Sequence, residues 1–228
     1  MARWIIRAVD WGNIQRSPTF EAIFNYFYSD SNSLPVPVVF DSAGTRVNQI
    51  MQNLTPIFKQ LDIMDASLTL DIVKGENKHL AEEIISDWYG KKEEQIPKKN
   101  KREITQLYSK IKENVHLRQM QYRNEALLDG GIPEQYLPGM RVPFKHDEKL
   151  KLIIPVEENI TQDIEDFYKP LENNQPVTEI YGDLVGIKPL KDELDGGIKI
   201  AKKQVEYFMK THEQAIERVN TLIAKIVI

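Results

Sequence analysis

The chain has 228 residues, of which 41% are hydrophobic and 28% are charged, and its formal net charge is −4. A chain of this length buries one substantial core, and its mildly acidic balance excludes a general affinity for nucleic acid or for an anionic membrane surface. The sequence contains no cysteine, which excludes disulfides, thiolate metal sites and a thiol nucleophile.

The sequence carries no signal for a membrane or for export. No apolar run approaches the roughly 18 residues that are needed to span a bilayer. The first seven residues, Met-Ala-Arg-Trp-Ile-Ile-Arg, lack the uninterrupted apolar stretch of a signal peptide. We therefore expect a cytoplasmic protein that has neither a membrane nor a nucleic-acid partner.

The N-terminal segment predicts a strand, an anion-binding loop and a helix. Trp4–Val9 is a short, mostly apolar run of the kind that forms a buried strand. A helix then begins at Ser17, because Pro18 suits the first helical position and apolar side chains follow at helical spacing (Phe20, Ile23, Phe24 and Phe27). A loop between such a strand and helix points backbone N–H groups and a helix N-terminus at an anion.

Further strands and helices alternate along the chain. Val36–Phe40 predicts a second strand that leads into Ser42–Thr45, and an amphipathic helix follows over residues 50–61. Leu68–Val73 predicts a third strand and Leu150–Ile154 a fourth. Strands that are separated by helices imply a parallel α/β sheet, with the binding site at the carboxyl ends of the strands.

Three motifs, in this order, carry a resemblance to a known family. The first is Asp-Trp-Gly-Asn-Ile-Gln-Arg-Ser-Pro over residues 10–18, the second is Ser-Ala-Gly-Thr over 42–45, and the third is Asp-Ile-Glu-Asp-Phe-Tyr over 163–168. Together they resemble the low-molecular-weight protein tyrosine phosphatases, over roughly Trp4–Tyr89 and Leu150–Tyr168. The resemblance implies a phosphotyrosine protein phosphatase I-like fold: three layers, with a four-stranded parallel sheet flanked by helices.

The resemblance also implies site residues. The family loop has the form C-x5-R-S, and the position of its nucleophilic cysteine is Asp10 in this chain. Arg16 corresponds to the arginine that holds phosphate oxygens bidentately, and Asp166 to the general acid. The implied ligand-binding residues are Trp11, Gly12, Asn13, Ile14, Gln15, Arg16, Ser17 and Tyr168. Glu165 and Phe167 replace two prolines of the family's acid-bearing loop, so we expect that loop to be less rigid.

The replacement at Asp10 decides the functional hypotheses. The residue that becomes phosphorylated in the family is missing, so we predict a phosphatase-like protein without ordinary thiol-dependent activity, acting as a phosphate-binding, phospho-ligand-binding or regulatory module. An alternative is an active phosphomonoester hydrolase, with Asp10 as nucleophile or metal ligand and Asp166 as general acid. A second alternative is a purely structural scaffold. Whether the chain is an enzyme stays open at this point.

The orientation of Asp10 stays open in the same way. A carboxylate has two acceptor oxygens and the loop is a set of donors. Turned inward, Asp10 accepts loop N–H bonds, pairs with Arg16 and occupies the anion site itself.

We expect no cofactor, since the four histidines (His79, His116, His146 and His212) lack the spacing of a metal site. Mg²⁺ enters only under the altered-chemistry alternative, where it would offset charge.

Two insertions interrupt the family core within what we expect to be a single domain over residues 1–228. The first spans 91–149 and contains a basic linker and a helix from about Glu103 to Leu128, which Gly130-Gly131 ends. The second spans 169–192, and a long helical pattern then closes the chain. The helix of the first insertion packs on its own domain or contacts a protein partner or a second copy of the chain.

Overall fold

The structure is a computed structural model that describes residues 3–29, 34–47, 97–170, 175–186 and 197–227. The predicted helix over 50–61 and the predicted strand Leu68–Val73 lie outside these residues. The chain divides into two compact units, of which the first comprises Met1–Asn48, Tyr122–Lys191 and Ile198–Ile228, and the second Gln49–Gln121 and Asp192–Gly197. The sheet and the candidate site belong to the first unit.

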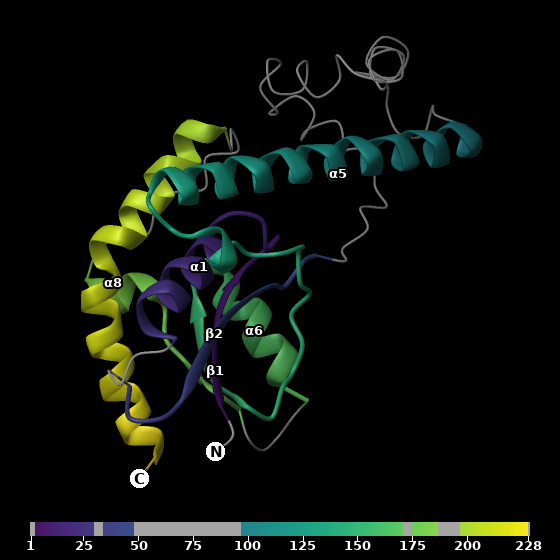
Figure 1. The fold of residues 1–228 in the computed structure, drawn as a ribbon. Helices are drawn as coiled ribbons and strands as arrows, with labels where there is room; N and C mark the ends of the chain where they lie inside the picture. The colour runs from purple at the N-terminus through teal and green to yellow at the C-terminus, as the bar shows by residue number, and fades with distance from the viewer. Residues whose placement is uncertain (1–2, 30–33, 48–96, 171–174, 187–196, 228) are drawn as a thin grey trace. The chain divides into compact units, whose positions relative to one another are not determined.

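A parallel sheet organises this unit (Figure 1). Its strands are β1 (Trp4–Asp10), β2 (Val38–Gly44), β3 (Leu150–Pro155) and β4 (Val177–Thr178), in the order β2-β1-β3-β4. Every neighbouring pair is parallel, and Asp10 at the end of β1 lies opposite Gly44 at the end of β2. The end of the first strand is therefore brought beside the Ser42–Thr45 motif.

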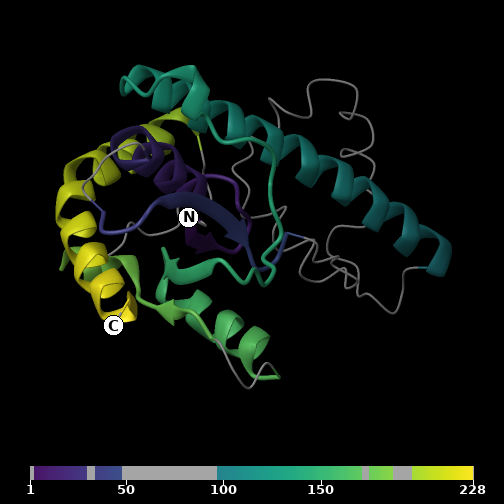
Figure 2. The same ribbon diagram turned by 60° about the horizontal axis from the view of Figure 1, so that its bottom comes forward.

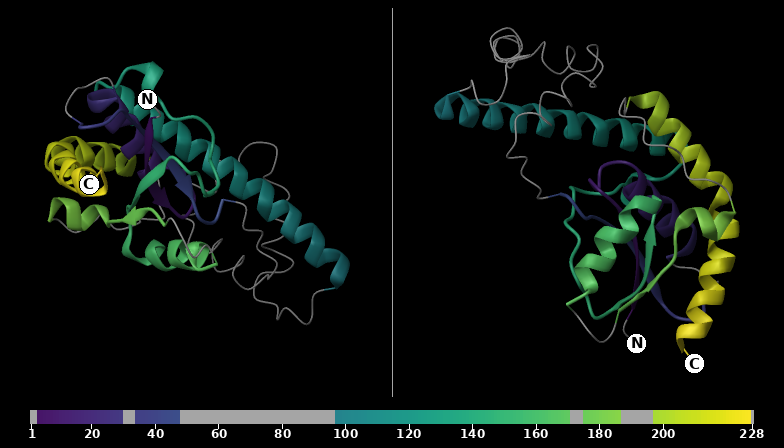
Figure 3. Two further views of the ribbon diagram at one scale, coloured as in Figure 1. Left: turned by 90° about the horizontal axis from the view of Figure 1, so that it is seen from below. Right: turned by 180° about the vertical axis from the view of Figure 1, so that it is seen from behind.

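Helices cover the two faces of the sheet. Figures 2 and 3 show α8 (Ile198–Val227) and α6 (Thr161–Tyr168) on opposite sides of the strands. On the α8 side also lie α1 (Arg16–Tyr28) and α7 (Tyr181–Val185), which contact α8. The α/β architecture of strands between helical layers is the predicted one.

Each face has its own apolar cluster. The larger cluster packs residues from α1, α7 and α8 against the sheet, and includes Ile6, Ala8, Phe20, Phe24, Phe40, Leu152, Ile154, Tyr181, Val205, Phe208 and Val219. The smaller one packs α6 on the other face, and comprises Val9, Leu150, Ile153, Ile160, Ile164 and Tyr168. Side chains of a strand alternate between faces, so β1 supplies both clusters.

Three remaining elements complete the described chain. A long helix, α5, spans Lys98–Asp129, and two short 3₁₀ helices cover Glu134–Tyr136 and Glu158–Ile160. The helix predicted over Glu103–Leu128 is thus confirmed, with an earlier start. Within the described residues, no helix is long and apolar enough to cross a membrane.

Residues 161–168 differ from the prediction. The expected loop over Asp163–Tyr168 is wrong, because these residues belong to helix α6. Ile164 and Tyr168 are four positions apart, so they share one helix face, and both are buried in the smaller cluster. Glu165 and Phe167 stand where prolines would have interrupted the helix. With glutamate and phenylalanine at these two positions, the segment forms a helix rather than a less rigid loop.

The 169–192 segment contributes regular structure as well. Its described residues include strand β4 and helix α7, which the sequence did not predict. β4 pairs with β3 through Leu152–Val177 and Ile153–Thr178. This segment therefore extends the sheet.

Candidate functional site

A short loop connects the end of β1 at Asp10 to the start of α1 at Arg16. Asn13 adopts φ 51°, a left-handed conformation that asparagine tolerates better than most residues. The loop passes close to the end of β2: a Cβ on Gly44 would lie 2.8 Å from both Asn13 N and Trp11 O. The turn therefore depends on a left-handed asparagine and on the missing side chain of Gly44.

The carboxylate of Asp10 points into this loop. One oxygen, Oδ1, accepts the N–H of Asn13, and Oδ2 accepts the N–H of Ser17 at 3.1 Å. Asp10 is 5% exposed, and burial raises its pKa against the lowering effects of the Ser17 amide and of Arg16. The carboxylate is therefore turned inward, with two loop amides bound to it. The pairing of Asp10 with Arg16 stays a prediction.

The guanidinium of Arg16 is held by a second carboxylate. Its Nη2 forms an ion pair with Oε1 of Glu157, and both side chains are largely buried. Glu157 lies just after strand β3, at the sheet edge where sites of parallel α/β proteins gather. Its position directly after a strand could have indicated Glu157 as a site residue, although the sequence analysis did not include it.

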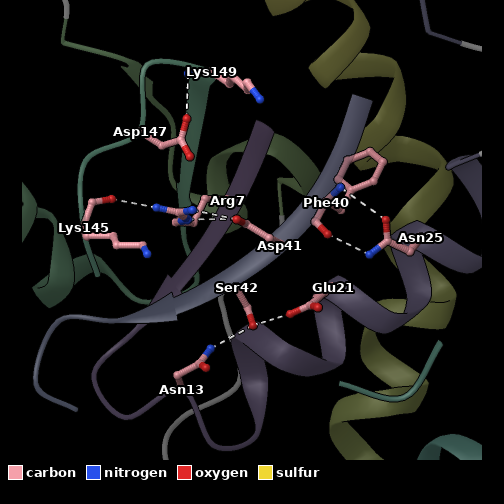
Figure 4. Close-up of polar contacts among 10 residues, drawn as sticks. All are labelled: Arg7, Asn13, Glu21, Asn25, Phe40, Asp41, Ser42, Lys145, Asp147 and Lys149. Carbon is pink, nitrogen blue, oxygen red and sulfur yellow. Dashed lines mark hydrogen bonds and ion pairs between the residues drawn. The ribbon is translucent and has the colours of Figure 1, made fainter. Parts of the chain in front are cut away.

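A buried polar network supports the loop from β2 and α1. In Figure 4 the hydroxyl of Ser42 lies between Asn13 and Glu21. Asn13 Nδ2 donates to Ser42 Oγ at 2.8 Å and to Ser17 Oγ at 3.3 Å, and Ser42 donates to Glu21. Burial raises the pKa of Glu21 to about 7. The Ser-Ala-Gly-Thr motif thus has a structural role: its serine accepts a hydrogen bond from Asn13 of the loop, and its glycine leaves room for the loop backbone.

An aromatic and charged group borders the loop on the α6 side. The guanidinium of Arg46 lies 4.5 Å from the ring centre of Trp11. Asp163 accepts from Arg46 Nε at 3.0 Å, from Arg46 Nη2 at 3.1 Å and from Thr45 Oγ1 at 2.8 Å. The hydrogen bond from Arg46 lowers the pKa of Asp163, so this side chain is an ionised anchor for α6.

The two other predicted site residues of α6 lie elsewhere on that helix. Asp166 is exposed and accepts from Gln162 Nε2 at 3.2 Å. Tyr168 is 3% exposed in the smaller apolar cluster, with its ring 6.1 Å from Phe144. Asp163, rather than Asp166, accepts the hydrogen bonds that join α6 to residues 45–46. The roles of Asp166 as general acid and of Tyr168 as aromatic wall stay predictions.

Among the described residues, no group of three or more His, Cys, Asp or Glu side chains is arranged to hold a metal ion. No protein-family model matches the sequence, and no curated protein matches it.

Solved structures do match. A YwlE mutant from Bacillus subtilis superposes with a TM-score of 0.52 at 16% identity, covering 96% of this chain and 99% of the other. The fold is that of the low-molecular-weight protein tyrosine phosphatases. Wzb of Vibrio vulnificus, in complex with benzylphosphonate, matches at 12% identity with a TM-score of 0.42, over 92% of this chain and 99% of that one. Primo-1 matches at 10% identity with a TM-score of 0.38, over 92% and 97%.

The fold prediction is therefore confirmed, on the first of these structures and on the observed sheet. An identity of 16% speaks for the fold alone.

Proposed function

We propose that this phosphatase-fold protein lacks thiol-dependent phosphatase activity and acts as a binding or regulatory module whose anion loop is closed by its own aspartate. The observation that carries the proposal is the position of the Asp10 carboxylate, which accepts the amides of Asn13 and Ser17. These amides belong to the loop that would otherwise bind an anion.

Electrostatics supports a closed loop. A phosphate that enters beside an ionised Asp10 meets a repulsion of about 4 kcal/mol per pair of unit charges at 4 Å, in the dielectric typical near a protein surface. That cost weakens binding by about a thousandfold. An external phosphoryl group therefore reaches the loop amides when Asp10 is neutralised or displaced.

The same geometry weighs against Asp10 as a nucleophile. An attacking oxygen has to be directed at phosphorus, and both carboxylate oxygens are engaged by backbone amides. Attack would require one of these bonds to break while a second anion arrives. The altered-chemistry alternative has no comparable supporting contact among the described residues.

The test is the hydrolysis of p-nitrophenyl phosphate and of a phosphotyrosine peptide by the pure protein. We expect no turnover by the natural chain. Ordinary phosphatase rates that Asp10→Asn abolishes would overturn the proposal.

Asp10→Cys is the companion variant, since it restores the thiol in a loop that keeps Arg16 and Ser17. Recovered hydrolysis in this variant, lost again in Asp10→Cys with Arg16→Lys, would support a loop that is intact apart from its nucleophile. The double variant is the matched control, because lysine keeps the charge and loses the bidentate geometry.

A further inference from the structure

The outward side of the loop is occupied by arginines. When backbone N–H groups converge on an anion, the carbonyls of the same loop point away and need donors of their own. Two of these carbonyls, those of Gly12 and Ile14, accept guanidinium hydrogen bonds. The donors, Arg141 and Arg123, come 129 and 109 residues later in the chain.

Arg123 is buried and connects three backbone positions. It is 1% exposed, and its Nη1 donates to Ile14 O at 2.9 Å. Nη2 donates to Pro138 O at 2.9 Å, with Gly139 O at 3.5 Å. One planar fork therefore fixes the end of the loop to the segment that follows α5.

Arg141 and its neighbours hold the middle of the loop. Arg141 Nε donates to Gly12 O at 2.7 Å, and the next residue, Val142, donates its N–H to Asn13 Oδ1 at 2.7 Å. Val142 O also accepts the N–H of Gly44 at 2.9 Å. Residues 138–142 are thus bonded both to the loop and to the end of β2.

The same segment is anchored beyond the loop. Arg7 of β1 pairs with Asp41 of β2 through Nη2–Oδ2 at 2.6 Å and donates Nη1 to Lys145 O at 2.7 Å (Figure 4). Phe144 N donates to Gly44 O at 2.9 Å. The backbone over 142–145 is therefore hydrogen-bonded to the sheet directly after Arg141.

Charge complements the geometry. A buried carboxylate is stable when opposite charge and hydrogen bonds compensate its lost hydration. Burial lowers the pKa values of both arginines, and nearby carboxylates oppose it: Glu21 and then Asp10 raise the pKa of Arg123, and Asp10 raises that of Arg141. The pKa of Arg123 falls to about 10, so it stays a cation at neutral pH.

We propose that Arg123 and Arg141 are positioning residues of the loop: they donate hydrogen bonds to its outward carbonyls and so hold its amides on the Asp10 carboxylate. This inference rests on the proposed function in one respect, since it takes the Asp10 carboxylate to be the anion that occupies the loop. It assigns part of the 91–149 insertion to the site, because the closed loop is incomplete without the side chains that this segment supplies.

The test is hydrogen exchange at the amides of Asn13 and Ser17, followed by NMR in the full chain. In Arg123→Met and in Arg141→Met we expect both amides to exchange about tenfold faster or more, which corresponds to about 1.4 kcal/mol of local stability. Core amides of α8, such as those of Val219 and Ile223, keep the rate of the natural chain. Arg218→Met, at an exposed arginine of α8, is the matched control and leaves the loop amides unchanged.

A conservative variant separates positioning from bulk packing. Arg141→Lys keeps the charge and one donor for Gly12 O, so its loop amides should exchange more slowly than those of Arg141→Met. Unchanged loop exchange in Arg141→Met, or acceleration of loop and α8 amides by the same factor, would overturn the proposal. Arg141 is half-buried, so its variants decide the matter if Arg123→Met does not fold.

The two proposals fail separately. Hydrolysis of p-nitrophenyl phosphate by the natural chain would remove the proposed function and leave the exchange result standing. Unaltered loop exchange in the arginine variants would remove the positioning role and leave the closed loop standing.

Discussion

Replacing Asp10 with serine should turn the closed loop into an anion-binding one. The change removes a buried carboxylate that accepts the amides of Asn13 and Ser17, and it leaves Arg16 and the other loop residues in place. The lost repulsion is about 4 kcal/mol for unit charges 4 Å apart, or about a thousandfold in affinity. Burial raises the pKa of Asp10, so any protonated fraction in the natural chain reduces this gain.

Isothermal titration with phosphate and with tungstate at pH 7 measures the effect. We expect Asp10→Ser to bind both anions more tightly than the natural chain does, by up to about a thousandfold where Asp10 is ionised. Asp129→Ser removes an exposed carboxylate that pairs with Lys202, and it serves as the control for net charge. Equal affinities of Asp10→Ser and the natural chain would refute the reasoning, because the carboxylate would then not occupy the site that the anion uses.

Two further predictions concern stability. Gly44→Ala should lower the free energy of unfolding by about 1–3 kcal/mol in urea denaturation, because its Cβ meets backbone atoms of the loop at 2.8 Å. Gly139→Ala, where nothing lies within 4 Å, should change it by less than about 0.5 kcal/mol, and equal effects would contradict the steric argument. Glu21 has a pKa of about 7 in the folded state against 4.5 ordinarily, so its contribution is fully present below pH 4.5 and is lost as pH rises through 7. Glu21→Gln should therefore gain stability over the natural chain between pH 5 and 8, by up to roughly 3 kcal/mol at 1.36 kcal/mol per pKa unit, and a pH-independent difference would contradict this.

Local patterns predicted most of the described sheet and helices. Trp4–Val9 and Leu150–Ile154 form strands because each is a short apolar run, and α1 begins within one residue of the predicted start. β4 escaped prediction because two residues, Val177 and Thr178, give no periodicity to detect. The prediction of an acid-bearing loop was wrong for a different reason. The loop was expected from the family pattern, but the prolines that would interrupt a helix are absent here and the segment forms α6.

The site was predictable only in part. The loop itself follows from a contiguous motif, and the inward turn of Asp10 was one of two orientations left open. The supporting arginines were not predictable, because Arg123 and Arg141 reach the loop from segments more than 100 residues away. Glu157 is as distant from Arg16, but its place just after β3 was a signal in the sequence. Nothing in the local sequence around an arginine says which carbonyl it will meet across such a separation.

The carboxylate inside the loop also has a consequence for folding. A loop of converging N–H dipoles that waits for an external anion is more stable when that anion is abundant, and its melting temperature follows the anion concentration. Here the anion is covalently part of the chain and is present at the same effective concentration in every solution. The folded state thus carries its own counter-ligand, and under the proposed function we expect its stability to be independent of the phosphate concentration.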